Sequence, residues 1–314
     1  MLQIDEATVD RVMDWQRLTE RMLESHRLPK PEIGDTLLRM GPNSILVRTA
    51  WIDGLGVAVK AATIFPGNQH PMATIQGEVL LFDKHHGHLL ASIHAASETR
   101  WKTAGDSALG SKLLSRPDSR TLLMVGAGTM SEPLIRAHVA VRPSIERIVV
   151  WNRSKHRAEG VGARLGDLGR QIAIADDLAS AVASADIVSC ATMSVDPVVQ
   201  GGWLKPGAHV DLVGAYRPDM REVDDEAMRR ARVFVNFRGT TIGHIGEITI
   251  PIETGVIREG DVLADLYDLA NGAPGRRSAE EITLYKNGGG AHLDLMTALA
   301  ITEGARAAGL GGAA

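Results

Sequence analysis

The stretch Thr121-Leu-Leu-Met-Val-Gly126-Ala-Gly128-Thr-Met-Ser131 decides the fold of this chain. Its first part is apolar and predicts a short buried strand, and the residues after it predict a helix over 131–141. Gly126 allows the tight turn between the two elements, and Gly128 lets a pyrophosphate approach the backbone closely. The amides that follow would face the phosphates at the positive end of the helix. This strand–turn–helix context predicts a dinucleotide-binding loop. The cofactor contacts predicted in the loop are Gly126, Gly128, Thr129 and Met130.

Outward from this loop, short apolar segments alternate with helical segments as far as residue 235. Strands that alternate with helices in this way predict an α/β fold, a doubly wound parallel sheet of the Rossmann type. The predicted strands are 121–125, 147–151, 172–174, 187–191, 210–213 and 233–235.

The flanking segments have another pattern. Helical spacing of apolar residues predicts one helix over 4–24, and short apolar runs separated by Gly, Pro, Asn and Asp predict a mostly antiparallel sheet after it. Arg116-Pro117-Asp118 is the clearest break before the Rossmann segment. The predicted strands are 44–51, 55–63, 78–82 and 88–95, and the other predicted helices are 98–115 and 291–308.

Composition excludes several classes of protein. A chain of 314 residues is long enough for two domains with separate cores. The net charge of −4 provides no basic field for nucleic acid. The N-terminus lacks the order of a signal peptide, and no apolar run approaches the roughly 20 residues of a membrane helix. A lone cysteine, Cys190, is typical of a reducing cytoplasm. No histidine group, His85-His86 included, has metal-ligand spacing with acidic partners, so we expect no metal.

The end of the second Rossmann strand bears on the choice of cofactor. Sites that prefer NAD place Asp or Glu here to bind the ribose 2′-hydroxyl, whereas this chain has Asn152 and Arg153. A guanidinium binds a 2′-phosphate through charge-assisted hydrogen bonds. The alternative is that Arg153 is a solvated residue at a helix start. We therefore expect NADPH to be favoured, with NADH possible, and both residues to contact it.

Several segments together resemble the ornithine cyclodeaminase/mu-crystallin family over nearly the whole chain. The segments that carry the resemblance are 57–63, 77–83, 102–109, 125–128, 151–153, 184–188, 203–209, 213–219 with Glu222, and 283–294. The resemblance implies an α+β substrate-binding and dimerisation domain formed by residues 1–117 and 290–314. The Rossmann NAD(P)-binding domain, residues 118–289, would be inserted between these two segments. It also implies a homodimer.

The resemblance implies which groups bind the substrate. Family substrates are α-imino or α-amino acids, and Lys60 matches the lysine that binds their carboxylate. From its residues alone, Lys60 lies in an apolar strand, where burial is costly unless an anion pairs with it; a chance lysine on an edge strand is the alternative. Lys102 stands where the family has an arginine, and keeps the charge without the bidentate fork. Arg48 is a further candidate cation or a solvated strand residue.

Other positions take their expected roles from the resemblance. Thr103 would hold a cofactor phosphate, and Thr74 would lie near the nicotinamide. Gly288 would face the substrate. Asp294 matches a family aspartate, and His94 replaces a common aspartate, as a proton relay or as a structural residue. The remaining cofactor contacts implied are Thr192, Val213, Gly214 and Arg217.

Tyr216 separates the activities found in the family. Ornithine cyclodeaminases have an aspartate here that handles the ornithine amine, and a tyrosine supplies no carboxylate. The resemblance therefore implies reduction of a cyclic imino acid: Δ1-pyrroline-2-carboxylate to L-proline, or Δ1-piperideine-2-carboxylate to L-pipecolate. Lys60 or an ordered water would protonate the imine, since no carboxylate is well placed by motif. The alternatives are ornithine cyclodeaminase, an amino-acid dehydrogenase such as alanine dehydrogenase, and a non-enzymatic NADPH-dependent binding protein.

Overall fold

The computed structural model describes residues 1–310 and divides the chain into two compact units. Unit 1 consists of Met1–Lys102 and the segment from Gly290 onward, and unit 2 is Thr103–Gly289. The first border lies inside helix α3 (Ala95–Leu114), whereas the sequence analysis placed it after the helix, at residue 117. The substrate and dimerisation roles assigned to these segments remain predictions.

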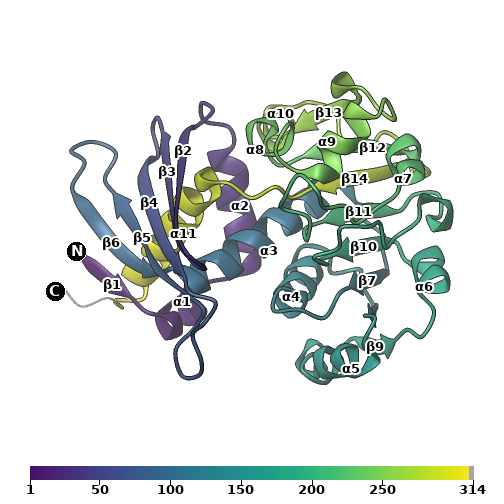
Figure 1. The fold of residues 1–314 in the computed structure, drawn as a ribbon, viewed down its shortest axis with the longest axis horizontal. Coiled ribbons are helices and arrows are strands. Elements are labelled where there is room, and N and C mark those ends of the chain that lie inside the picture. Colours follow the sequence, from purple (N-terminus) through teal and green to yellow (C-terminus); the bar gives the residue numbers. More distant parts are fainter. Residues whose placement is uncertain (311–314) are drawn as a thin grey trace. The chain divides into compact units, whose positions relative to one another are not determined.

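Unit 2 contains an eight-stranded sheet, in the order β13-β12-β14-β11-β10-β7-β8-β9, in which every pair of neighbours is parallel (Figure 1). Its central strands are short apolar runs, as expected for strands covered on both faces. The α/β fold predicted from the strand–helix alternation is confirmed. The strands are β7 (Thr121–Val125), β8 (Arg147–Trp151), β9 (Gln171–Ile174), β10 (Ile187–Cys190), β11 (His209–Leu212), β12 (Ala231–Val235), β13 (Val262–Asp265) and β14 (Ile282–Lys286).

The order of the strands fixes where a ligand can bind in unit 2. β7 lies between β8 and β10, so the chain leaves β7 in one direction and later returns to its other side. Ligands bind at such a switch point, outside the carboxyl ends of the strands. The covering helices are α4 (Ser131–Val141), α5 (Lys155–Ala163), α6 (Leu178–Ser184), α7 (Asp225–Arg230), α8 (Arg238–Thr241), α9 (Gly246–Glu253) and α10 (Leu266–Ala270), with 3-10 turns η1 (Gly166–Leu168), η2 (Gly201–Trp203) and η3 (Glu259–Asp261).

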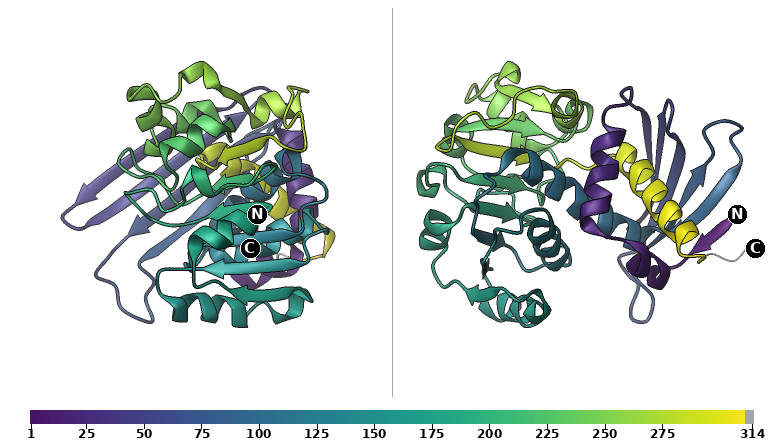
Figure 2. Two further views of the ribbon diagram at one scale, coloured as in Figure 1. Left: turned by 90° about the vertical axis from the view of Figure 1, so that its right-hand side faces the viewer. Right: turned by 180° about the vertical axis from the view of Figure 1, so that it is seen from behind.

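Unit 1 contains a six-stranded sheet in the order β1-β6-β5-β4-β3-β2, which is antiparallel except for the β1–β6 pair. Helices α1, α2 and α11 lie on one face of the sheet (Figures 1 and 2). The elements are β1 (Leu2–Ile4), α1 (Glu6–Val12), α2 (Trp15–Ser25), β2 (Glu32–Met40), β3 (Asn43–Ile52), β4 (Gly56–Ile64), β5 (Ile75–Phe82), β6 (Leu89–His94) and α11 (Ala291–Ala307).

The single helix predicted over 4–24 is wrong. The segment is a strand followed by two helices, because Asp5 and Asp14 each cap a helix N-terminus with a side-chain hydrogen bond, to the amides of Thr8 and Arg17. The second cap interrupts the helical spacing. No helix within residues 1–310 is both long enough and apolar enough to cross a membrane.

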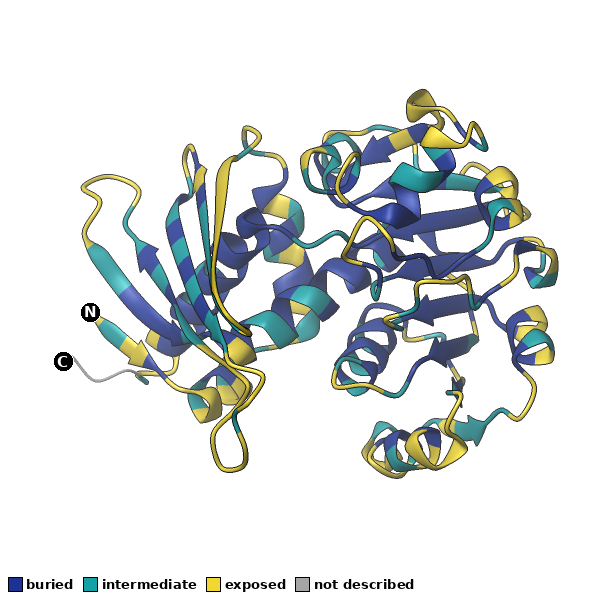
Figure 3. Cartoon of the chain, in the orientation of Figure 1, coloured by how far each residue is buried: buried dark blue, intermediate teal, exposed yellow. Residues whose placement is uncertain are grey.

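The register of the six-stranded sheet places Lys60 on its helix-covered face. Lys60 lies opposite Arg48 on β3 and opposite Val79 on β5. Since side chains alternate along a strand, Ala58 and Ala62 share this face with Lys60, and all three are buried. Figure 3 shows buried and half-buried positions alternating along the strands of this sheet. A charged residue thus lies in an otherwise apolar row, directly beneath α11.

Candidate active site

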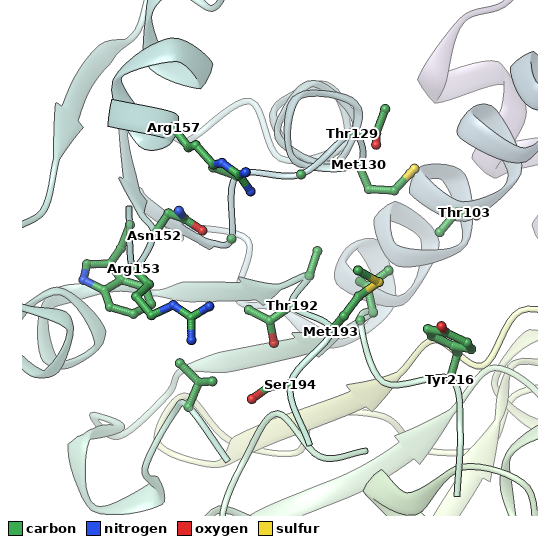
Figure 4. Close-up of a pocket in the computed structure, with 18 residues that line it drawn as sticks. Thr103, Thr129, Met130, Asn152, Arg153, Arg157, Thr192, Met193, Ser194 and Tyr216 are labelled. Carbon is green, nitrogen blue, oxygen red and sulfur yellow. The ribbon is translucent and has the colours of Figure 1, made fainter. Parts of the chain in front are cut away.

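A cavity of about 720 Å3 in unit 2 lies at the carboxyl ends of β7, β8, β10 and β11 (Figure 4). This is the edge of the sheet at which the strand order predicts a nucleotide. Ten of the residues predicted to contact the cofactor line it: Thr103, Gly126, Gly128, Thr129, Met130, Asn152, Arg153, Thr192, Val213 and Gly214. Arg157 also lines the cavity, as do Ala127, Trp151 and Ser194, for which no contact was predicted.

The two glycines of the loop are required for different reasons. Gly126 has a φ of 115°, and a Cβ there would lie 2.6 Å from the carbonyl oxygen of Ala191. At Gly128 a Cβ would meet no atom within 4 Å, so its Cα faces the open cavity. Ser131, in place of a third glycine, donates from Oγ to the Gly126 carbonyl over 3.0 Å. The loop therefore fits a pyrophosphate, with α4 directing its N-terminus toward it.

The far end of the cavity is positively charged. The Arg153 and Arg157 side chains lie on the two sides of Asn152 (Figure 4). Asn152 donates from Nδ2 to the carbonyl of Ser154 over 3.0 Å, which fixes the turn after β8. Among the described residues that line the cavity, none is acidic. This end of the cavity therefore suits an anionic group.

A buried carboxylate holds two of the loops that line the cavity. Glu222 accepts hydrogen bonds from the Thr192 amide (2.7 Å) and hydroxyl (2.9 Å) through Oε1, and from the Gly214 amide (2.6 Å) through Oε2. Its own amide donates to Glu247 over 2.6 Å. Burial raises the pKa of both carboxyls, that of Glu247 to about 7, while the buried Lys286 opposes the rise. Sequence reasoning noted Glu222 only as part of a resembling segment and missed this contact.

Unit 1 contains a second group of polar residues, which we call the lysine–carboxylate cluster: Lys60, Glu98, Lys102 and Asp294. Lys60 Nζ donates to Glu98 Oε2 over 2.7 Å, to Asp294 Oδ1 over 3.2 Å and to the Thr99 hydroxyl. Lys102 Nζ donates to the same Asp294 oxygen over 2.5 Å. All four members of the cluster are more than nine-tenths buried. The anion that buried Lys60 requires is thus present within the protein.

The pKa values of the four groups in the cluster are shifted in different directions. Burial raises the pKa of Asp294, but Lys102 and Lys60 outweigh it and lower that pKa to about 2. Burial also disfavours charge on Lys60, yet Glu98 and Asp294 outweigh it and raise its pKa. For Glu98 burial dominates and raises the pKa to about 7, whereas burial lowers the pKa of Lys102. With Glu98 protonated, two cations face one carboxylate, and the surplus positive charge can bind a second one.

From the sequence, no carboxylate was well placed by motif to supply a proton, and the structure places one beside Lys60. Glu98 lies in hydrogen-bond contact with the lysine predicted to act on the substrate. No motif identified it, because Glu98 and Lys60 are brought together only by the packing of α3 against the sheet. The remaining buried oxygen of Glu98, Oε1, has no hydrogen-bond partner within the described structure.

Arg48, opposite Lys60 in the sheet, is half-buried and paired with Asp35 at 2.9 Å, and together with Lys102 and Lys60 its charge lowers the pKa of Asp294. Three other predicted residues lie outside both groups. Gly288 belongs to unit 2, where its amide donates to Asn236 Oδ1 over 3.1 Å. Thr74 is exposed in the β4–β5 connection. Arg217 pairs with Asp219 at 2.8 Å and does not line the cavity.

His94 also stays apart from the lysine–carboxylate cluster. Its Nδ1 lies 2.8 Å from the Ser97 hydroxyl. On β6 it stands opposite Glu78, on the sheet face away from Lys60. This position favours the structural role over the proton relay.

Comparison with known proteins places the chain in a family. The model of the ornithine cyclodeaminase/mu-crystallin family matches residues 50–309. The chain belongs to this family. Within it, the chain is 49% identical over 288 residues to the Δ1-pyrroline-2-carboxylate reductase of Paracoccus denitrificans, a match that covers 91% of each protein. It is 32% identical over 247 residues to the ketimine reductase mu-crystallin of Mus musculus, which covers 77% of this chain and 74% of the relative.

A solved structure matches the whole chain. The Δ1-pyrroline-2-carboxylate reductase of Thermococcus litoralis, determined in complex with NADH and L-proline, has a TM-score of 0.91 at 27% identity and covers 100% of both chains. The resemblance drawn from the sequence segments is therefore confirmed.

Proposed function

We propose that this protein is an NAD(P)H-dependent reductase of cyclic imino acids, converting Δ1-pyrroline-2-carboxylate to L-proline and, as a second substrate, Δ1-piperideine-2-carboxylate to L-pipecolate. The observation that carries the proposal is the 49% identity, over 91% of each chain, to a Δ1-pyrroline-2-carboxylate reductase. The nucleotide cavity of unit 2 and the lysine–carboxylate cluster of unit 1 support it, because they match the two ligands of such a reaction.

The cofactor favoured by the cavity is NADPH. Arg153 and Arg157 offer two guanidinium groups next to Asn152, at the turn where an acidic residue would bind the ribose of NADH. Guanidinium groups bind phosphate oxygens through charge-assisted hydrogen bonds. NADH is a second candidate cofactor, since the loop at Gly126 and Gly128 would contact the pyrophosphate, which both cofactors share.

The nicotinamide nucleotide would supply the hydride, and the protein supplies charge and a proton. Lys60 and Lys102 bind the substrate carboxylate and so orient C2 of the imine. Reduction adds a hydride to C2 and a proton to the ring nitrogen, so one proton must come from the protein or from solvent. Lys60 delivers this proton through Nζ, and Glu98 returns one to Lys60 across their 2.7 Å hydrogen bond.

Tyr216 favours reduction over cyclodeamination. It lines the cavity and its side chain is exposed, where the resemblance places the aspartate of ornithine cyclodeaminases. A phenol does not offer the ionised carboxylate that the ornithine amine needs. Ornithine cyclodeaminase, alanine dehydrogenase and NADPH-dependent binding without turnover are the other outcomes of the test.

The test follows the absorbance of the reduced cofactor when purified protein is mixed with NADPH and Δ1-pyrroline-2-carboxylate. We expect consumption of cofactor and stoichiometric formation of L-proline. Ornithine with NAD+ and alanine with NAD+ serve as parallel reactions. Proline formation from ornithine without turnover of the imine would replace the proposal by cyclodeamination. Tight NADPH binding without turnover of any of the three substrates would replace it by a binding function.

We also propose that the protein is a cytoplasmic homodimer. On the sheet face opposite Lys60, the apolar side chains of Leu38, Met40 and Trp51 are 63%, 84% and 64% exposed. Apolar side chains gathered on one face are typical of a protein interface. A second copy covers the same face on both partners in a symmetric dimer. Light scattering should give twice the chain mass, and Trp51→Asp should shift it toward the monomer; a wild-type monomer contradicts the proposal.

A further inference from the structure

The turn between β5 and β6 in unit 1, residues Asp83 to His88, brings together three side chains that can bind metal. The ligand atoms of Asp83, His86 and His88 all lie within 4.8 Å of one another. Among residues 1–310, this is the one group of His, Cys, Asp or Glu side chains close enough together to hold a metal ion. No metal was expected from the sequence, because no histidine group, His85-His86 included, has metal-ligand spacing with acidic partners. Neither the nucleotide cavity nor the lysine–carboxylate cluster includes them.

The backbone holds this turn in a defined shape. The Asp83 amide donates to the His88 carbonyl over 2.9 Å, which closes the hairpin, and the Gly87 amide donates to the Asp83 carbonyl over 3.1 Å. Gly87 has a φ of 69°, which favours glycine, and it reverses the chain between the two histidines. Asp83 Oδ1 accepts from the amides of His85 (3.0 Å) and His86 (2.6 Å). The carboxylate is therefore fixed before any ligand arrives.

The distances fit a small divalent cation. His86 Nδ1 lies 3.5 Å and His88 Nδ1 lies 3.6 Å from Asp83 Oδ1. Zinc binds nitrogen and oxygen at about 2.0–2.2 Å, so tetrahedral ligand atoms are roughly 3.4 Å apart. Two of the three separations thus need almost no adjustment. The third requires a rotation of imidazole rings whose side chains are 83% and 62% exposed, so they are free to rotate.

We propose that Asp83, His86 and His88 form a binding site for a divalent transition-metal ion of the Zn2+, Co2+ and Ni2+ type. Two imidazoles and one carboxylate are the ligands these ions prefer, whereas Mg2+ and Ca2+ prefer oxygen alone. Water completes the coordination, since the site lies on the surface. The ion links the two ends of the turn and so stabilises the β5–β6 hairpin.

The test uses the full chain without a histidine tag. Titration with ZnCl2 in a calorimeter should show one saturable equivalent, and Co2+ should give a visible ligand-field band at the same stoichiometry. His86→Ala and His88→Ala should each lose this equivalent or weaken it more than tenfold. His85→Ala is the matched control, because His85 is exposed on the same turn but outside the group. It should bind as the wild type does.

The outcomes separate the site from general histidine binding. No saturable equivalent in the wild type overturns the proposal, as does equal weakening by His85→Ala and His86→Ala. Because all three variants alter exposed side chains, thermal unfolding without metal should be alike for all of them. Added Zn2+ should raise the melting temperature of the wild type and of His85→Ala only.

Discussion

The nucleotide cavity and the lysine–carboxylate cluster differ in how they are built and in how far they are exposed to solvent. The cavity of unit 2 is open and built largely from backbone, with Gly128 facing empty space and arginines exposed at one end. The cluster of unit 1 is closed and built from side chains, with Lys60 and Asp294 each more than nine-tenths buried. The absence of side chains at the loop gives the cavity room for a large ligand, whereas close packing in the cluster holds charged groups away from water.

This difference predicts how each region responds to substitution. Removing a group from the cluster leaves a buried charge without its partner, which costs several kcal/mol. Adding a group to the cavity costs ligand affinity but leaves the fold unchanged. Substitutions in the cluster should therefore lower turnover and leave cofactor affinity unchanged, whereas substitutions in the cavity should lower cofactor affinity.

The largest effect should come from Lys60→Met, which keeps the volume and removes the charge. We expect kcat/KM for the imino acid to fall about a hundredfold to ten-thousandfold, because both carboxylate binding and proton delivery are lost. NADPH affinity, measured by cofactor fluorescence, should stay unchanged, since Lys60 is not among the residues that line the cavity.

Controls distinguish catalysis from misfolding in this variant. Lys30→Met changes an exposed lysine of the same unit and should retain full activity. The double variant Lys60→Met/Glu98→Gln removes the uncompensated buried carboxylate, so it should recover thermal stability without recovering turnover. Recovery of turnover in the double variant would contradict the role given to Lys60.

Gly128→Ala should give the next largest effect, and it should lower cofactor affinity, which Lys60→Met leaves unchanged. The added methyl group occupies the space expected for the pyrophosphate, and such crowding costs about 1–3 kcal/mol, up to roughly a hundredfold in affinity. NADPH and NADH should weaken alike. Gly166→Ala is the matched control, because a Cβ there also meets no atom within 4 Å, yet Gly166 does not line the cavity. Equal cofactor affinity in both variants would contradict the loop assignment.

The same contrast explains how much could be predicted from sequence. The cavity depends on contiguous motifs: the turn at Gly126 and the Asn152-Arg153 pair each follow a strand directly, so local patterns predicted them and the α/β fold. Strands β13 and β14 were missed, because Val262–Asp265 and Ile282–Lys286 are short and carry polar residues within a buried sheet. Their strand character comes from their neighbours in the sheet.

The cluster could be predicted only in part. Lys60, Lys102 and Asp294 were noted through resemblance, but their contacts join residues separated by 192 and 234 positions. Glu98 was missed altogether, because an acidic residue in the first turn of a helix is an ordinary surface feature and nothing local shows that it is buried. Arg217, given a cofactor role through the resemblance, pairs with its near neighbour Asp219 and does not line the cavity.

Arg153→Ala should have a smaller effect than Gly128→Ala and should divide the two cofactors. Loss of a charge-assisted hydrogen bond to the 2′-phosphate costs about 1.5 kcal/mol, roughly tenfold in NADPH affinity. NADH affinity should be unchanged, since NADH has no such phosphate. Arg147→Ala, which changes an exposed arginine at the start of β8, the strand that precedes Arg153, is the control. An equal loss for both cofactors would show that Arg153 does not recognise the phosphate.

The smallest effect, and the one that best tests the closed character of the cluster, is the pH dependence due to Glu98. Burial raises its pKa from 4.5 to about 7, so the folded protein binds this proton over a range in which the unfolded chain has lost it. Its contribution to stability is therefore complete below about 4.5 and is lost as the pH rises through about 7. Turnover should fall over the same upper range, because Lys60 loses its proton supply.

Glu98→Gln keeps an oxygen for Lys60 but does not titrate. The difference in melting temperature between wild type and variant should therefore decline between these two pH limits. The step in the kcat profile of the wild type should be missing from that of the variant. The protonation of the substrate imine itself is common to both proteins and cancels in the comparison. Parallel pH profiles for the two proteins would mean that the proton comes from solvent, and that the cluster binds charge without supplying the proton.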